Sequence, residues 1–417
     1  MRSLILLLFF SIYCLNIIIG QEIAQWRGPD RDGIYPDKNL LKSWPENGPE
    51  LILSVKNIGK GFSSPVMYNG TIYVTGMFDT TDYLTAMDMN GNFKWQVPYG
   101  RSWLYDPPDT RSTPTVQGDR VFVVSGTGRL VCIDTGTGKE IWAVDVDKDY
   151  HSEWHRWGVA ESPLIVDDKV ICSPGGKENS LVAFDKMTGK LIWKSGSVGG
   201  QRSYVSPILF EFNTIRLVLA MTSTSFFAVD PKNGEVQCSY QFYLKSNEPR
   251  PSGAILANTP VFSNDEIYIT GGYNLPSVML KLAPDGKSVT EKWVDSTLDN
   301  HHHGVVQVNG YIYGSNWIHN NSGNWVCLNW NTGEVEYESL WNSKGNVIYA
   351  DGMLYLYEEK SGYVGLAKAD PAKFEVVSSF QITEGEGQHW AHPAIFDGKL
   401  YIRHGDVLLI YDIKAKQ

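Results

Sequence analysis

One pattern recurs along this chain of 417 residues. A full copy starts at Ser162-Pro163, continues through alternating strands to Asp185, turns at Gly189 and ends on a strand that carries Trp193. The Pro position or its equivalent falls at residues 65, 114, 163, 207, 260, 305, 347 and 393, which gives a period of 42 to 53 residues. Four short alternating strands at this period are typical of one blade of a β-propeller, because each small sheet must pack against neighbouring blades. The sequence therefore predicts an all-β fold, an eight-bladed β-propeller.

The last copy of the pattern ends after three strands, at Lys414. Residues Glu50 to Val55 have the character of a strand and precede the first copy. We predict that Leu51 to Val55 pairs with the last blade, because this pairing closes the ring and removes an exposed sheet edge. A single propeller domain is expected over residues 21–417.

Residues 1–20 have the features of a signal peptide. Arg2 is their one charge, and an apolar run from Leu4 to Phe10 follows it. Cys14 raises the alternative of a lipoprotein, although Tyr13 stands where a lipobox has a small residue. Later apolar runs are too short to span a membrane. We expect an exported protein, either periplasmic or secreted.

The net charge bears on the type of partner, and the cysteine positions bear on whether disulfides form. The net charge is −10 and there is no basic stripe, which argues against nucleic acid as a partner. Cys132 and Cys327 fall where other copies have Ala, Cys238 falls at the Trp position, and Cys172 lies within a predicted strand. We expect these four cysteines to be buried and unpaired, each acting as a small apolar side chain.

The repeat resembles that of a known family. The pattern Ala183-Phe184-Asp185, Thr188-Gly189 and Trp193 is similar to the PQQ-type propeller repeat. The opening Gln25-Trp26-Arg27-Gly28-Pro29, with Arg31-Asp32-Gly33, resembles the start of many exported bacterial proteins of that superfamily. The resemblance covers roughly residues 26 to 414 and implies the propeller fold, but one fold supports many functions.

Three functional classes are implied by this resemblance. Quinoprotein alcohol dehydrogenases bind pyrroloquinoline quinone with calcium, an assembly lipoprotein of the outer-membrane barrel-insertion machinery is a non-enzymatic scaffold, and carbohydrate-active propellers include lyases of acidic polysaccharides. The quinoprotein class implies a vicinal disulfide over the cofactor, and this chain has no Cys-Cys pair. We therefore do not expect the quinone as a cofactor.

Unusual residues gather in the segments just before each Ser/Thr-Pro position, here called the approach segments. Seven of the nine histidines lie in them, namely His151, His155, His301, His302, His303, His389 and His392. Side chains alternate between the two sides of an extended chain, so the residues one and three positions before each Pro position lie on the same side. The members of that set that can carry chemistry are Arg111, Tyr204, His302, Trp390 and His392, and we expect them to form a ring at one end of the central channel. His303 and Glu161 are expected to point away.

This residue set suits β-elimination from a uronic acid. Arg111 or Arg202 would neutralise the substrate carboxylate. His302 or His392 would take the α-proton, and Tyr204 would protonate the leaving oxygen. The leaving group is either a sugar, as in a lyase, or water, as in a dehydratase.

Further approach-segment residues would contact an anionic oligosaccharide. The candidates are Trp390, Trp157, His389 and His155, of which the two tryptophans suit stacking on sugar faces.

Other functions stay open at this point. A zinc ion could be held by His302 with His389 and His392 across the channel. A glycan- or protein-binding scaffold without catalysis is the main alternative, and a quinone-dependent alcohol dehydrogenase is a further one. Glycoside hydrolysis is poorly represented, because Glu161 lacks an obvious carboxylate partner.

Overall fold

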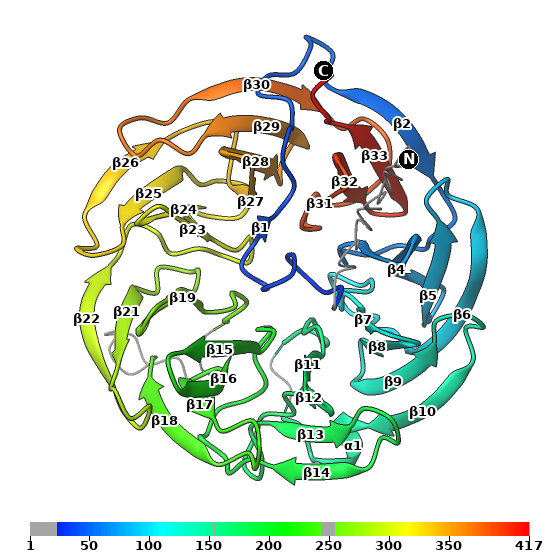
Figure 1. The fold of residues 1–417 in the computed structure, drawn as a ribbon, viewed down its shortest axis with the longest axis vertical. Helices are drawn as coiled ribbons and strands as arrows, with labels where there is room; N and C mark the ends of the chain where they lie inside the picture. Colours follow the sequence, from blue (N-terminus) through cyan, green and yellow to red (C-terminus); the bar gives the residue numbers. More distant parts are fainter. Residues whose placement is uncertain (1–22, 154–155, 243–254, 417) are drawn as a thin grey trace, which may run out of the picture.

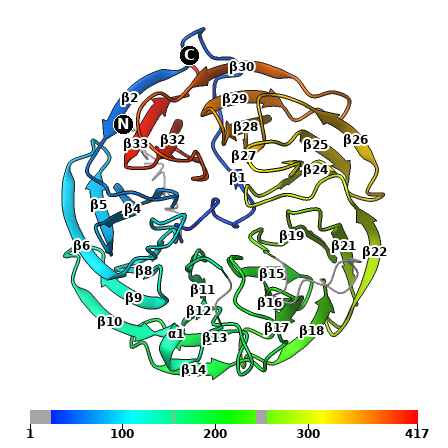
Figure 2. The same cartoon turned by 180° about the vertical axis from the view of Figure 1, so that it is seen from behind.

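A computed structural model describes residues 23–153, 156–242 and 255–416. Its strands form eight sheets arranged around a central axis (Figure 1), and the view from behind shows the same ring (Figure 2). The predicted eight-bladed propeller is confirmed. The predicted signal peptide lies outside the described residues.

In blades one to six the sheet is antiparallel, and its strands follow one another from the axis outwards. Blade one comprises β3 (Val66–Tyr68), β4 (Thr71–Phe78), β5 (Thr81–Asp88) and β6 (Phe93–Arg101). Blade two comprises β7 (Thr115–Gln117), β8 (Arg120–Val124), β9 (Arg129–Asp134) and β10 (Glu140–Asp145). Blade three comprises β11 (Leu164–Val166), β12 (Lys169–Cys172), β13 (Val182–Asp185) and β14 (Leu191–Lys194). Blade four comprises β15 (Ile208–Phe212), β16 (Ile215–Met221), β17 (Ser225–Val229) and β18 (Val236–Gln241). Blade five comprises β19 (Val261–Ser263), β20 (Glu266–Ile269), β21 (Ser277–Leu282) and β22 (Val289–Asp295). Blade six comprises β23 (Val306–Val308), β24 (Tyr311–Ser315), β25 (Trp325–Asn329) and β26 (Val335–Ser339). Blade seven comprises β27 (Gly345–Ala350), β28 (Met353–Glu358), β29 (Tyr363–Lys368) and β30 (Val376–Gln381), and the inner strands of blade eight are β31 (Ala394–Phe396), β32 (Lys399–His404) and β33 (Val407–Asp412). The short helix α1 (Val146–Asp149) follows β10. Within the described residues, no helix has the length and apolar character needed to span a bilayer.

The ring is closed by a strand from near the start of the chain. β2 (Glu50–Val55) pairs antiparallel with β33, with Ser54 opposite Leu409. In Figure 1, β2 (blue) lies at the rim beside β33 (dark red). The predicted closing strand is therefore confirmed, and β2 supplies the outer strand that blade eight lacks.

The conserved spacing of Trp and Gly within the repeat has a packing reason. The indole N–H of Trp142 donates to the carbonyl of Lys186 in the next blade at 3.2 Å, and its ring lies directly over Gly189. A Cβ on Gly189 would approach the Trp142 ring to 2.7 Å, and the φ of this glycine is +70°. Trp193 repeats the arrangement over Gly234. The Trp of one blade thus requires a glycine turn in the next blade.

The cysteines take the places expected of small apolar side chains. Cys132, Cys172, Cys238 and Cys327 are all buried and free. The prediction of unpaired, buried cysteines is confirmed.

The sequence analysis did not anticipate how the N-terminal segment is used. Residues 23–33 cross the middle of the ring, and β1 (Ile34–Tyr35) then pairs in parallel with β27 (Figure 1). Blade seven therefore has five strands. The segment brings Trp26 and Arg27 into the central channel, next to the candidate site.

Candidate active site

A cavity of about 460 Å³ lies at one end of the central channel. The approach segments of seven blades supply most of its wall, and Trp26 of the N-terminal segment contributes as well. Its chemically distinctive lining residues are Trp26, Phe62, Arg111, Trp157, Tyr204, Tyr273, His301, His302, Glu359, Trp390 and His392. The cavity thus brings together the five residues of the predicted ring and the predicted stacking residue Trp157.

Arg111 supplies a cation to this cavity. Its guanidinium donates to the backbone carbonyls of Pro107 and Asp109 and lies 6.0 Å from the ring centre of Phe62. Burial lowers the pKa of Arg111 to about 10, so the side chain stays charged at neutral pH. In the part of the chain that the structure describes, no carboxylate forms an ion pair with it. A carboxylate on a ligand would fill that role.

Tyr204 lies in the same wall beside Trp157, with 5.6 Å between the ring centres. Its phenolic oxygen accepts the backbone N–H groups of Arg156 and Trp157 at 3.0 and 2.9 Å. Burial raises the pKa of Tyr204 above its ordinary value, although these two hydrogen bonds act in the opposite direction. The phenol is therefore protonated at neutral pH, and two fixed donors face any negative charge that develops on its oxygen.

His302 contributes a neutral imidazole ring to the cavity. Its ring packs between those of His301 and His303, at 4.3 and 4.2 Å, and edge-on to Trp390 at 5.2 Å. Burial, followed by the neighbouring His303 and His301, holds its pKa well below the ordinary value. Among the described residues no hydrogen bond reaches its ring nitrogens, and its nearest ionic neighbour is Glu359 at 3.9 Å. A neutral imidazole with uncommitted nitrogens is able to accept a proton from a ligand.

His392 is committed to protein contacts. Its Nδ1 lies 3.1 Å from Nη1 of Arg27, which only donates, so Nδ1 is the acceptor and carries no proton. Its Nε2 then carries the proton and donates to the carbonyl of His302 at 3.2 Å. Both nitrogens are used, and the predicted role of His392 as an alternative base does not fit this geometry. Its contacts instead fix the backbone of His302.

Arg202 does not reach the cavity, in contrast to its predicted role in carboxylate binding. It is buried, forms ion pairs with Asp147 and with Glu161, the latter at 3.1 Å, and donates to the carbonyl of Ser173. The chain around residue 202 forms an isolated bridge with Thr222. The two acids that surround Arg202 leave it unavailable to a ligand. The prediction that Glu161 points away from the ring agrees with its place in this cluster.

The remaining predicted residues also lie away from the cavity wall or outside the described residues. His389 stacks on His404 with 3.8 Å between ring centres and contacts the hydroxyl of Tyr357 at 2.7 Å. It does not line the cavity, so the structure does not bring it together with the other predicted substrate-binding residues. His155 lies outside the described residues.

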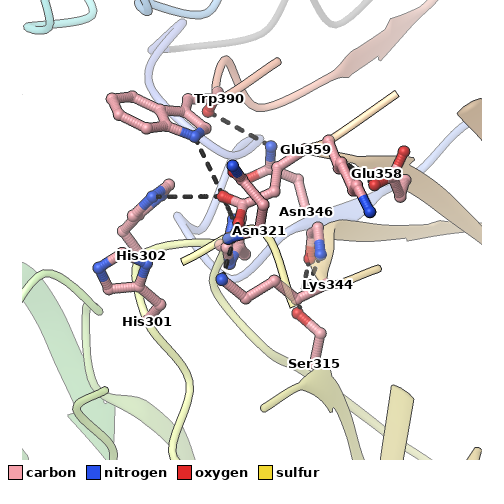
Figure 3. Close-up of polar contacts among 12 residues, drawn as sticks. His301, His302, Ser315, Asn321, Lys344, Asn346, Glu358, Glu359 and Trp390 are labelled. Carbon is pink, nitrogen blue, oxygen red and sulfur yellow. Dashed lines mark hydrogen bonds and ion pairs between the residues drawn. The ribbon is translucent and has the colours of Figure 1, made fainter. Parts of the chain in front are cut away.

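Glu359 is a central residue that the sequence analysis missed. Its carboxylate lines the cavity and accepts from His303 at 3.0 Å, Trp390 at 3.0 Å and Lys344 at 2.8 Å (Figure 3). The backbone N–H of Asn321 adds a fourth donor at 3.2 Å. Burial alone would raise the pKa of Glu359, but the contacts with His303 and Lys344 outweigh it and lower the pKa to about 2. The residue is hard to find from sequence because it follows β28, in a turn outside the approach segments.

Tyr273 is a second missed residue. It lines the cavity with φ of +66°, and the next residue, Asn274, has φ of +61°. Large side chains rarely adopt this conformation, and such strain gathers at functional sites. The Tyr273 hydroxyl contacts Nε2 of His301 at 2.8 Å, which fixes that ring beside His302.

The zinc site predicted from His302, His389 and His392 is not assembled, because His389 lies elsewhere. A different group, His301, His302 and Glu359, places its ligand atoms within 4.8 Å of one another. However, Glu359 already accepts four hydrogen bonds, one of them from the cation Lys344. Because the protein's own donors already occupy the Glu359 carboxylate, its oxygens are not available as metal ligands.

Pyrroloquinoline quinone does not fit the cavity either. The quinone carries three carboxylates, whereas Arg111 is the one cationic residue of the lining among the described residues and Glu359 adds an anion. None of the four described cysteines lines the cavity. The residues therefore do not provide the features that the quinoprotein class implies.

Comparison with known proteins agrees with the fold. The sequence model of the family described as "Outer membrane protein assembly factor BamB" matches residues 80–336. The quinohemoprotein alcohol dehydrogenase ADH IIB of Pseudomonas putida is 28% identical over 171 residues, which is 36% of this chain and 22% of that protein. The outer membrane protein assembly factor BamB of Alkalilimnicola ehrlichii is 26% identical over 183 residues, 42% of each chain.

A solved structure extends the likeness to nearly the whole ring. The crystal structure of BamB from Moraxella catarrhalis superposes with a TM-score of 0.63 and 15% identity, covering 87% of this chain and 99% of that one. At this identity the likeness shows the fold alone. The chain also spans less than half the length of the curated relatives described here.

Proposed function

This chain belongs to the propeller family described as outer membrane protein assembly factor BamB, and because that fold supports several functions, we propose its function from the site: β-elimination on small sugars that carry a carboxylate. The observation that carries the proposal is the combination in one cavity of three groups: Arg111, which forms no ion pair with a carboxylate among the described residues, neutral His302 and protonated Tyr204. The substrates would be oligosaccharides that contain uronic acid.

The proposed reaction needs three groups, and each has one role. Arg111 pairs with the substrate carboxylate and lowers the pKa of the C–H bond next to it, at C5 of the uronate. His302 takes the C5 proton, and the electron pair of that bond forms the C4–C5 double bond. The C4–O bond breaks, and Tyr204 gives its proton to the leaving oxygen. The products are an unsaturated uronate and either a shortened sugar or water.

Glu359 supports the base after it has taken the proton. The carboxylate lies 3.9 Å from Nε2 of His302 and carries a full negative charge, so it stabilises the imidazolium that forms during the reaction. It also holds the Trp390 ring through the indole N–H at 3.0 Å. Trp390 and Trp157 then provide apolar faces for the sugar rings.

The site of action is proposed to be outside the cytoplasm. The family description and the name of the Alkalilimnicola relative both refer to an assembly factor of outer membrane proteins. This agrees with the export expected from residues 1–20, and we propose that the protein works in the periplasm or is secreted.

The test is a panel of uronic-acid oligosaccharides incubated with the purified protein. Elimination is measured as ultraviolet absorbance of the unsaturated product, and loss of water is followed by mass spectrometry. His302→Gln and Tyr204→Phe are expected to lower the rate by about 10²- to 10⁴-fold, the usual contribution of an acid or base. His151→Gln, an exposed histidine outside the cavity, is the matched control. Absence of product from every substrate with folded protein would overturn the proposal.

A binding scaffold is the second candidate function. It is favoured by the name of the family, an assembly factor, and by the aromatic wall of the cavity, which suits a glycan without any reaction. In that case His302→Gln would leave ligand affinity nearly unchanged and no turnover would be measured with any ligand that binds.

A further inference from the structure

The N-terminal segment, residues 23–33, divides the central channel in two. Trp26 lines the cavity of about 460 Å³ described above. The neighbouring residues Gly28 to Asp32 instead line a second cavity of about 1120 Å³, whose other walls come mostly from the inner strands of blades one, three, four, five and eight. The two cavities share no lining residue. The segment is therefore a partition across the channel.

Two buried arginines hold this partition to the ring. Arg27 donates to the carbonyl of Val305 at 2.7 Å and of Val347 at 3.3 Å, in blades six and seven. Arg31 donates to the carbonyls of Ser162 and Pro207 in blades three and four, both at 3.0 Å. The two side chains are only 3% and 2% exposed. Each guanidinium thus spans two blades, on opposite sides of the axis.

The blades are shaped to receive the partition. Gly304 takes the place that Ser or Thr holds in the first five blades. A Cβ at Gly304 would lie 2.1 Å from Nη1 of Arg27 and 2.6 Å from its Cζ. The repeat thus has a glycine in place of Ser or Thr at the position where the Arg27 guanidinium packs. A backbone pair between Ala24 and Val116, with hydrogen bonds of 2.9 and 2.8 Å, anchors the start of the segment.

We propose that the candidate site is blind-ended and accepts only the end of a sugar chain, holding one or two units with a carboxylate. This inference rests on the proposed function. A chain cannot thread through the ring, because residues 23–33 close the channel behind the site. A volume of about 460 Å³ is also near the low end of the roughly 300–1,000 Å³ range of ligand pockets. The aromatic floor at Trp26, packed edge-on against His392 at 5.2 Å, would meet the terminal sugar.

The experiment measures how binding depends on chain length. Homo-oligomers of one uronic acid, from the dimer to a long polymer, are titrated into the His302→Gln variant by calorimetry, so that turnover does not deplete them. We expect one protein bound per chain at every length, with a similar affinity per mole of chain. Several proteins per long chain would overturn the blind-ended site while leaving the proposed chemistry intact. Absence of both binding and elimination at every length would overturn the proposed function and this inference with it.

A variant of the floor gives an independent readout. Trp26→Ala is expected to weaken the dimer and the long polymer by the same factor, on the order of tenfold, because every bound chain would place its end on this ring. A loss confined to the dimer would contradict the proposal, because long chains would then bind without their ends. Product analysis of the wild-type protein adds a third measure: the smallest products should form from the start, without longer intermediates.

Discussion

Nε2 of His302 lies 3.9 Å from Oε2 of Glu359, in the wall of a cavity that also holds Arg111 and Tyr204. The distance is too long for a direct hydrogen bond and short enough for a strong effect of charge. The pair therefore joins an uncharged base to an anion that stays charged down to strongly acid pH.

Glu359→Gln is expected to weaken the base. Without the anion, the protonated form of His302 loses its stabilising partner and its pKa falls further. The acid limb of the kcat/KM profile should then move to lower pH, and the rate at neutral pH should fall by about 10- to 100-fold.

The neighbouring carboxylate offers a matched control for this variant. Glu358 is also buried, but it accepts the backbone N–H groups of Lys360 and Ser361 at 2.7 and 2.8 Å and does not line the cavity. Glu358→Gln should leave the pH profile in place. Equal shifts in both variants would show that the change is structural rather than electrostatic.

Arg111→Gln should remove the preference of the site for a sugar with a charged carboxylate over its uncharged ester. A charge-assisted hydrogen bond contributes about 1.5–3 kcal/mol, so affinity for a uronate should fall about 10- to 100-fold. Affinity for the methyl ester of the same sugar should change little. Arg216→Gln, which breaks an exposed ion pair with Asp167, is the control. Binding to both sugars is measured by calorimetry, and an equal loss for acid and ester would contradict the role of Arg111.

Gly304→Ser is expected to destabilise the protein although it restores the consensus of the repeat. The new Cβ would meet the Arg27 guanidinium, and φ at this position is +72°. Gly310→Ser separates the two effects, because Gly310 has φ of +86° and open space around its Cα. We expect about 1–3 kcal/mol of additional loss at Gly304, the usual effect of overpacking. Urea unfolding measures the free energy of unfolding of both variants. Equal decreases would mean that the Arg27 side chain moves aside without cost.

Stability should fall as the pH drops below about 6.5, the ordinary pKa of histidine. Burial, with the charge of Arg27, holds the pKa of His392 well below that value in the folded protein. The unfolded chain therefore binds a proton there that the folded chain does not, and the free energy of unfolding rises with pH. His302 acts in the same direction.

His392→Gln tests this dependence. Glutamine keeps an acceptor for Arg27 and a donor for the His302 carbonyl, but it does not titrate. Between pH 7 and 5 the free energy of unfolding should depend less steeply on pH, by up to about 1.4 kcal/mol per pH unit. His151→Gln serves as the control. Identical slopes for His392→Gln and the wild type would mean that His392 binds no proton on unfolding in this range.

The ring and half of the candidate site could be predicted because both depend on local periodicity. The blade period predicted eight sheets, and the parity of residues before each Pro position placed Arg111, Tyr204 and His302 in one wall. Residue type alone suggested Arg202 as the cation, but its ion pairs with Asp147 and Glu161 join segments far apart in the sequence.

The remaining residues required long-range contacts that no local pattern reports. Glu359 reaches the cavity from a turn after β28, and its partner His303 lies 56 residues earlier in the chain. Trp26 reaches it because two arginines anchor the N-terminal segment to four blades. Tyr273 does so through a backbone conformation that its residue type disfavours.

The pairing of β2 with β33 also means that the ring can close only when the last strand of the chain is present. The last contact of the ring joins residues near 50 to residues near 410, so it forms only after almost the whole chain has been synthesised. Until then the blades are an open stack with two unpaired edges, and a loop of this length is slow to close. For the export proposed above, this means that the ring cannot be completed before its C-terminal strand has been translocated.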